Sequence, residues 1–208
     1  PGRGWRAKPH RVVKDVCLDV RPGETVGLVG ESGSGKTVTA MMVSGLLRPE
    51  QADFRGRILL DGEDLLHAGG QRIRAIQGKD ICVVFQEPMS AMDPTMRIGP
   101  QVEECLRVHT DLSAQERRQR ALQALRDVEL PDPEGVYRKY PHELSGGMLQ
   151  RVMIAAAIVA RPRLLLADEP TTALDVTIQA QILDLMKALQ AQTGMAIIFI
   201  THDLGVVA

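Results

Sequence analysis

Residues 30–37 read Gly-Glu-Ser-Gly-Ser-Gly-Lys-Thr and fit the phosphate-binding loop pattern G-x-x-x-x-G-K-[ST]. The apolar, β-branched run Thr25–Val29 comes directly before them and is typical of a buried strand. A flexible Gly/Ser linker is the alternative, but a linker needs neither a strand before it nor Lys-Thr at its end. The pattern therefore predicts a phosphate-binding loop between a strand and a helix.

The residue types of this loop suit phosphate groups and Mg²⁺. Glycines let the backbone curl so that successive N–H groups face one point, and a helix beginning near Lys36 adds the positive end of its dipole. Lys36 can reach the β- and γ-phosphates, while the Thr37 hydroxyl can ligate Mg²⁺. We expect the nucleotide to contact Gly30, Glu31, Ser32, Gly33, Ser34, Gly35, Lys36 and Thr37.

Three further apolar runs have the length and composition of buried strands, namely Ile81–Phe85, Leu164–Ala167 and Ala196–Ile200. Before the last run, a helical stripe at positions i, i+3, i+4 and i+7 is formed by Ile182, Leu185, Met186 and Leu189. Helices that alternate with buried strands indicate a parallel sheet. We therefore predict an α/β fold built on a parallel sheet.

The segment 87–161 has a different pattern, with helical periodicity and no strand. Ser113 and Glu116 have the spacing of a capping box, which predicts the start of a helix. That helix carries Ala121, Leu122, Leu125 and Val128 on its inner side, and the run 131–135, Pro-Asp-Pro-Glu-Gly, ends it. We predict a nucleotide-binding core in two parts, 1–86 and 162–208, with a helical subdomain inserted at 87–161.

The composition limits the classes of function. The 208 residues are 44% hydrophobic and 25% charged with a net charge of −1, as in a soluble globular protein without an excess of basic charge. Arg117, Arg118 and Arg120 have no aromatic residues between them, so we expect a solvated helix face and no nucleic-acid partner. The longest apolar helical run, 152–160, is shorter than the ~20 residues that cross a bilayer.

The three cysteines, Cys17, Cys82 and Cys105, match no zinc or iron–sulfur pattern. We expect reduced thiols in a reducing compartment, with Cys82 buried in its apolar run. His10, His67 and His109 are expected at the surface rather than as ligands. The chain has no initiator Met and no helix-ending signal at its last residues, which indicates a fragment truncated at both ends.

Polar residues follow three of the predicted strands. Asp168 and Glu169 end one strand, where ligands bind in open α/β sheets. We expect Asp168 to hold Mg²⁺ and Glu169 to accept a proton from the water that attacks the γ-phosphate. Gln86, directly after the run Ile81–Phe85, can position water or ligate the metal. His202 can bind the γ-phosphate or orient the attacking water.

A second loop, Leu144-Ser145-Gly146-Gly147-Met148, precedes the apolar helix through 152–160. Ser145, Gly146 and Gly147 would expose backbone N–H groups at a helix N-terminus, which is a second anion site. One nucleotide does not need two such loops from one chain. The second loop therefore indicates a dimer in which it contacts the neighbour's nucleotide.

In this order, the motifs resemble those of the ATP-binding subunits of ABC transporters over almost the whole chain. Residues 30–37 are similar to the Walker A loop, Gln86 to the Q-loop glutamine and 144–150 to the signature. Asp168 and Glu169 are similar to the Walker B pair, 173–175 to the D-loop and His202 to the switch histidine. The resemblance implies ATP and Mg²⁺ as cofactors, a RecA-like P-loop core, and an ATP contact for Asp175.

The segments 84–91, 140–148 and 168–178 resemble the dipeptide, oligopeptide and nickel branch of bacterial importers. At position 149, Leu149 resembles the residue found in the metal-importing members of this branch. At position 93, many members have Asn where this chain has Asp93. The resemblance implies an ATPase that powers import of peptides or nickel from the cytoplasmic face of the inner or plasma membrane. Its cargo cannot be read from this chain.

The resemblance also implies partners. Two cassettes, identical or paralogous, form a head-to-tail dimer, in which each ATP lies between Walker A of one subunit and Ser145-Gly146-Gly147 of the other. Two membrane-spanning permease subunits and, indirectly, a substrate-binding protein complete the transporter. Trp5 is the one Trp or Tyr before Gly30, so it is the candidate for stacking on adenine.

Two other functions are compatible with the same motifs. One is an ABC-type ATPase that works on nucleic acid or ribosomes, but such proteins usually carry tandem cassettes, a coiled-coil insertion or a basic linker. The other is a regulatory cassette that binds ATP without turnover, against which Glu169 and His202 argue.

Overall fold

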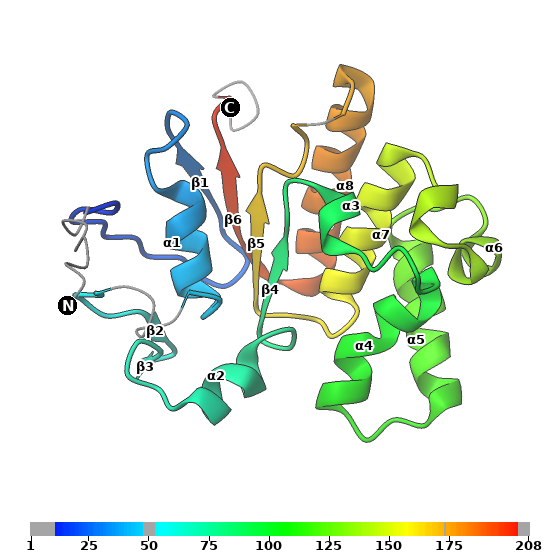
Figure 1. Ribbon diagram of the computed structural model, residues 1–208, viewed down its shortest axis with the longest axis horizontal. Helices are drawn as coiled ribbons and strands as arrows, with labels where there is room; N and C mark the ends of the chain where they lie inside the picture. The colour runs from blue at the N-terminus through cyan, green and yellow to red at the C-terminus, as the bar shows by residue number, and fades with distance from the viewer. Residues whose placement is uncertain (1–10, 48–52, 173, 204–208) are drawn as a thin grey trace, which may run out of the picture.

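A parallel sheet forms the centre of the molecule (Figure 1). The computed structural model describes residues 11–47, 53–172 and 174–203. The four strands lie in the order β1-β6-β5-β4 and all neighbours run parallel. Their bounds are Thr25–Val29 (β1), Ile81–Val84 (β4), Leu164–Asp168 (β5) and Ala196–Thr201 (β6). The predicted α/β fold with a parallel sheet is confirmed.

Alternate residues of each strand pack on opposite faces of the sheet. Along β5, Leu165 and Ala167 belong to the larger hydrophobic cluster, and Leu166 belongs to a smaller one with Ala40 and Ile76. The helices that cover the faces are α1 (Lys36–Val43), α2 (Gly70–Ile76), α7 (Gly146–Ile158) and α8 (Val176–Thr193). Burial on both faces explains why β4, β5 and β6 read as continuous apolar runs, whereas the residues of β1 are only partly buried or exposed.

A short hairpin and helix α2 were not anticipated by hydrophobic periodicity. Strands β2 (Leu59–Leu60) and β3 (Glu63–Asp64) pair antiparallel through a two-residue turn. Asp61 and Gly62 both have positive φ, at 50° and 84°, as a type I′ turn requires. Two-residue strands are too short for a period-2 pattern, so the Asp-Gly dipeptide was the available signal.

All the elements between β4 and β5 are helices. They are α3 (Pro88–Ala91), α4 (Ile98–His109), α5 (Ala114–Asp127), α6 (Pro133–Arg138), a 3₁₀ turn at Pro141–Glu143, and α7. In Figure 1, α4 to α7 gather on the side of the sheet beyond β4. The predicted helical insertion at 87–161 is consistent with this arrangement, and its limits as a separate subdomain stay a prediction.

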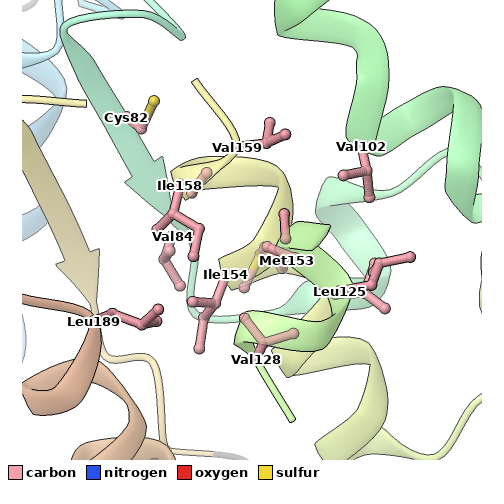
Figure 2. Close-up of a cluster of buried hydrophobic side chains, with 14 of the residues drawn as sticks. Cys82, Val84, Val102, Leu125, Val128, Met153, Ile154, Ile158, Val159 and Leu189 are labelled. Atoms are coloured by element: carbon pink, nitrogen blue, oxygen red, sulfur yellow. The ribbon is translucent and has the colours of Figure 1, made fainter. Parts of the chain in front are cut away.

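Helix α7 joins the helical segment to the sheet. Figure 2 shows Ile154 and Ile158 of α7 beside Val84 of β4, and Leu125 of α5 near Met153. All of them belong to one hydrophobic cluster that reaches from α4 to β6. The helices and the sheet therefore share a continuous core, which fixes the start of α7 relative to the strand ends.

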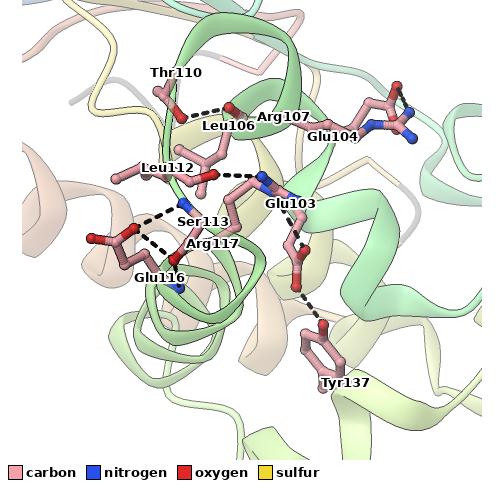
Figure 3. A network of polar contacts seen from close by, with 10 residues as sticks. All are labelled: Glu103, Glu104, Leu106, Arg107, Thr110, Leu112, Ser113, Glu116, Arg117 and Tyr137. Atoms are coloured by element: carbon pink, nitrogen blue, oxygen red, sulfur yellow. Dashed lines mark hydrogen bonds and ion pairs between the residues drawn. The ribbon is translucent and has the colours of Figure 1, made fainter.

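The capping box is confirmed. The Ser113 hydroxyl accepts a bond from the Glu116 N–H at 3.3 Å, and the Ser113 N–H donates to Glu116 at 2.8 Å. The prediction that Arg117 lies on a solvated face is wrong. Its side chain is 22% exposed, donates to the Leu112 carbonyl at 2.6 Å, and lies 4.0 Å from Glu103 of α4 (Figure 3).

The same network explains why the sequence pattern of α5 alone did not predict the burial of Arg117. Glu103 also accepts a hydrogen bond from the Tyr137 hydroxyl of α6, so an acid on α4 draws side chains from both neighbouring helices (Figure 3). Burial and the Glu103 carboxylate raise the pKa of Tyr137 to about 12. Arg118 and Arg120 are exposed as predicted, and Arg118 lies over the Tyr137 ring at 5.2 Å.

Smaller differences from the expectations concern strand ends and histidines. Strand β4 ends at Val84, so Phe85 lies outside it and is 37% exposed, whereas β5 and β6 each extend one residue further than predicted. Cys82 is buried as expected. His67 is exposed, His109 is half-buried and His10 lies outside the described residues.

In the described ranges, no helix has both the length and the apolar character needed to cross a membrane.

Candidate active site

Three neighbouring strands bring the predicted polar residues to one edge of the sheet. Strand β5 lies between β4 and β6, and parallel strands end at the same edge. Gln86 follows β4, Asp168 ends β5 with Glu169 directly after it, and His202 follows β6. The fold thus places at one edge residues that are far apart in the sequence, as expected of ligand sites in open α/β sheets.

The phosphate-binding loop curls around the ammonium group of Lys36. Lys36 begins α1, is 9% exposed, and donates from Nζ to the carbonyls of Gly30 at 2.7 Å and Glu31 at 3.0 Å. An ammonium group has three N–H donors, so these bonds leave one for a phosphate oxygen. Lys36 therefore holds the loop in shape while its charge lies at the loop's centre.

Two glycines of the loop have backbone conformations that suit glycine. Gly33 and Gly35 have φ values of 80° and 94°, in the left-handed region. A Cβ on Gly35 would also lie 3.2 Å from the Val12 carbonyl and 3.0 Å from Val13. The segment before β1 therefore packs against the loop, a contact that the sequence did not indicate.

Asp168 fits a magnesium ligand. It is 7% exposed, and its Oδ1 atom is buried without a hydrogen-bond partner in the described part of the chain. Burial raises the pKa of Asp168, and repulsion from Glu169 adds to the rise, although the Thr37 hydroxyl and Lys36 oppose it. A buried carboxylate oxygen beside a threonine hydroxyl is the oxygen-donor chemistry that Mg²⁺ prefers.

The candidate metal ligands do not form a closed cage. Among the described residues, no cluster of three or more His, Cys, Asp or Glu side chains is suited to hold a metal. Thr37, Asp168 and the amide oxygen of Gln86 offer a partial set of oxygen ligands. A partial set suits Mg²⁺, which keeps waters and takes further ligands from nucleotide phosphates.

The carboxylate of Glu169 is held by three side chains. Its Oε2 atom accepts a hydrogen bond from Gln86 Nε2 at 3.1 Å and another from Thr172 Oγ1 at 2.9 Å. Its Oε1 atom lies 3.2 Å from His202 Nδ1. Glu169 and His202, which were predicted separately as site residues, are therefore in contact, and Gln86 also contacts Glu169.

The surroundings of Glu169 keep its carboxylate ionised. Burial raises the pKa, but hydrogen bonds from His202 and Thr172 and the charges of His202 and Lys36 outweigh it, so the pKa lies below the usual value. The backbone of Glu169 is left-handed, with φ 47°, and its N–H donates to the Ile200 carbonyl of β6 at 2.9 Å. An ionised carboxylate in a fixed place can accept a proton.

A cleft extends from the candidate metal ligands. It has a volume of roughly 330 Å³, begins at Thr37 and Asp168, and passes Gln86 to reach Met41 of α1 and Ser90 of α3. The cleft therefore connects the strand ends to the first residues of the helical segment. The sequence did not predict it, because its walls come from separate elements.

The second loop lies at the start of α7, as predicted. Ser145 is the N-cap of α7 and accepts a bond from the Met148 N–H at 3.4 Å. A Cβ on Gly147 would lie 3.1 Å from Ile178 of α8, so the loop packs against that helix. Asp175 is exposed and caps α8 through the Ile178 N–H at 3.0 Å.

Within the described residues, the hydrogen bonds of Ser145 and Asp175 stay at their own helix starts and do not join them to residues 30–37. Their predicted contacts with a neighbour's nucleotide remain predictions. Trp5 lies outside the described residues. Thr172 was missed, because a threonine three positions after Glu169 carries no motif of its own.

A phosphate-binding loop and two carboxylates at the end of a parallel strand define a P-loop ATPase. A family model described as ABC transporter matches residues 13–172. The chain belongs to this family, which confirms the resemblance found in its motifs.

Several relatives in this family are named for the transport of peptides or peptidoglycan. The peptidoglycan transport ATP-binding protein YejF of Agrobacterium fabrum is 52% identical over 94% of this chain and 36% of its own length. The dipeptide transport ATP-binding protein DppD is 48% identical in Bacillus subtilis and 46% in Escherichia coli, over 95% and 99% of this chain. These matches cover 59% and 63% of the two DppD proteins, so the chain spans less than two thirds of each relative.

Solved structures share the fold. The dimeric ATP-binding cassette MJ0796 in a post-hydrolysis state, bound to ADP and Pi, is 33% identical with a TM-score of 0.82, over 94% of this chain and 82% of that one. CbiO1 of Clostridium perfringens, part of the ABC transporter complex cbiONQ, is 29% identical with a TM-score of 0.78, over 94% and 74%. The expected ABC ATPase fold is thereby confirmed.

Proposed function

We propose that this protein binds and hydrolyses ATP as the ATP-binding subunit of a peptide importer. The observation that carries the proposal is the meeting of Lys36, Asp168 and Glu169 at one sheet edge, with the base ionised and the metal ligand buried. The family and the named relatives support the same activity.

Each of these residues has its own role in the proposed reaction. The loop N–H groups and Lys36 bind the β- and γ-phosphates. Thr37, Asp168 and Gln86 would hold Mg²⁺, which would neutralise part of the charge of the phosphates. Glu169 accepts a proton from the attacking water. The water oxygen bonds to the γ-phosphorus while the bond between the γ-phosphorus and the ADP oxygen breaks. His202, beside Glu169 at 3.2 Å, orients the base and contacts the γ-phosphate.

The second loop supports a dimer of cassettes. Ser145, Gly146 and Gly147 lie at the exposed start of α7, with Gly147 half-buried against α8. In the proposed dimer they bind the ATP held by the partner's loop, so ATP links two cassettes that are identical or paralogous. The dimeric state of the MJ0796 cassette supports this arrangement.

Transport follows from coupling this dimer to membrane proteins. Two permease subunits at the cytoplasmic face of the membrane would contact the cassettes at the region after Gln86, where the cleft lies. A substrate-binding protein would deliver the cargo. The named relatives favour peptides over nickel as that cargo, because their names refer to dipeptides, oligopeptides and peptidoglycan.

Light scattering of the full-length Glu169→Gln variant tests the proposal. Without proton transfer, Mg-ATP should accumulate between two cassettes and convert monomer to dimer. The same variant carrying Lys36→Ala should stay monomeric, because it lacks the phosphate contact. ATP binding without a dimer contradicts the assignment of Ser145 in trans. Binding without any hydrolysis by the wild type, with or without its partners, supports a regulatory cassette instead.

A further inference from the structure

We propose that Thr172 is a positioning residue that holds the carboxylate of Glu169 through its hydroxyl group. The inference rests on the proposed function, in which Glu169 accepts a proton during ATP hydrolysis. Thr172 lies in the loop after β5, three positions beyond Glu169. Its hydroxyl donates to Glu169 Oε2 at 2.9 Å, and its N–H donates to the Glu169 carbonyl at 3.3 Å.

The loop that carries Thr172 is fixed from the other side by α8. Gln179 Nε2 donates to the carbonyls of Thr171 and Leu174, both at 3.0 Å. These two carbonyls flank Thr172, and Thr171 is buried at 6% exposure. The Thr172 hydroxyl is therefore presented to Glu169 from a place that α8 determines.

The other two partners of Glu169 have additional predicted tasks. Gln86 is a metal ligand as well as a donor to Oε2, and His202 also serves the γ-phosphate. His202 and Gln86 both come from the ends of other strands, and the His202 side chain is 53% exposed. Thr172 donates hydrogen bonds to Glu169 from both its backbone and its side chain. Of the three partners, Thr172 is therefore the one whose proposed role concerns Glu169 alone.

A fixed carboxylate matters because proton transfer depends on alignment. The Thr172 bond selects the orientation of Oε2 and thereby sets the direction of Oε1. Loss of the hydroxyl should slow the chemical step. It should leave ATP binding unchanged, because the described hydrogen bonds of Thr172 go to Glu169 and not to residues 30–37.

The test compares two substitutions at Thr172 in the full-length protein. Thr172→Val removes the hydroxyl at almost constant shape, and Thr172→Ser keeps it. Thr193→Val is the matched control, since it removes a hydroxyl that donates to the Leu189 carbonyl at 2.7 Å near the other end of α8. Steady-state ATPase kinetics, ATP affinity and the melting temperature are measured for each variant.

We expect Thr172→Val to lower kcat about 10-fold with KM for ATP within about twofold of the wild type. Thr172→Ser should retain kcat within about threefold. A wild-type kcat in Thr172→Val, or an equal loss in the Ser and Val variants, overturns the inference. If Thr172→Val melts early, Thr172→Ala replaces it in the same comparison with Ser. A wild type that hydrolyses no ATP overturns the proposed function itself, and this inference with it.

Discussion

The side-chain amide of Gln86 donates from Nε2 to Oε2 of Glu169 at 3.1 Å, across 83 positions of the sequence. One end of this neutral side chain thus contacts the proposed base, while its other end, the amide oxygen, is the atom able to ligate Mg²⁺. Gln86 also lines the cleft that leads to α3. It therefore contacts the proposed base, and it lines the same cleft as the candidate metal ligands Thr37 and Asp168.

Replacing this amide should slow hydrolysis. Gln86→Ala removes a donor to Glu169, and we expect kcat to fall about 10-fold. Gln86→Glu should be more harmful, because it places a like charge beside Glu169 and raises the pKa of that carboxyl. The additional loss should be larger near pH ~6 than near pH ~8, since a raised pKa leaves more of the base protonated. Profiles of ATPase activity against pH for both variants check this prediction. If the activity of Gln86→Glu relative to Gln86→Ala is the same at both pH values, the prediction is contradicted.

Gly35→Ala should destabilise the protein more than Gly33→Ala. Both positions have left-handed backbones, which cost an L-residue about 1–2 kcal/mol. A Cβ on Gly35 would also press on the Val12 carbonyl, whereas a Cβ on Gly33 has no heavy atom within 4 Å. Denaturant unfolding of the two variants measures the difference in the free energy of unfolding. Equal losses would show that the segment before β1 does not pack against the loop.

Gly99→Ala should destabilise the helical segment without affecting ATP affinity. A Cβ on Gly99 of α4 would lie 2.3 Å from the Tyr137 ring, so the ring must move out of its place between α4 and α6. Such overpacking typically costs about 1–3 kcal/mol. The control is Gly70→Ala at the start of α2, where a Cβ has no heavy atom within 4 Å. Thermal melts and ATP titrations distinguish the two, and a similar melting temperature for both would refute the expected clash.

The three cysteines should react with iodoacetamide in order of their exposure. Cys17 is exposed and should be alkylated first. Cys105 is half-buried, and burial raises its pKa to about 11. Cys82 is buried, and burial raises its pKa to about 12, so little thiolate forms even near pH ~9. Mass spectrometry of timed samples checks the order, and Cys82 should react only on unfolding in denaturant. Early alkylation of Cys82 in the folded protein would contradict its packing between the sheet and α7.

Local patterns predicted most of the secondary structure near the site. The run Thr25–Val29 forms β1 with the bounds expected from its apolar residues, and α1 begins at Lys36. Long elements buried on both faces have strong patterns, which is why the parallel sheet was identified. The hairpin of Leu59–Leu60 and Glu63–Asp64 was missed, because two residues carry no periodicity.

Arg117 shows where a local pattern is insufficient. Its neighbours in the sequence are charged, which is typical of a solvated face. Glu103 on α4 and the Leu112 carbonyl nevertheless hold its side chain partly buried. The contact depends on how α4 packs against α5, and no periodicity within α5 describes that packing.

Sequence patterns alone predicted the residue types of the site: a glycine-rich loop with Lys36, acids at the end of one strand, and polar residues after two others. These follow from local backbone preferences and from the alternation of buried residues. Which of these residues contact one another depends on how the elements pack in three dimensions. Glu169 gained Gln86, His202 and Thr172 as partners because parallel strands end at a common edge and α8 holds the loop of Thr172. Such contacts depend on distances that are set by packing between helices and strands. The sequence pattern of a single helix or strand does not describe these distances.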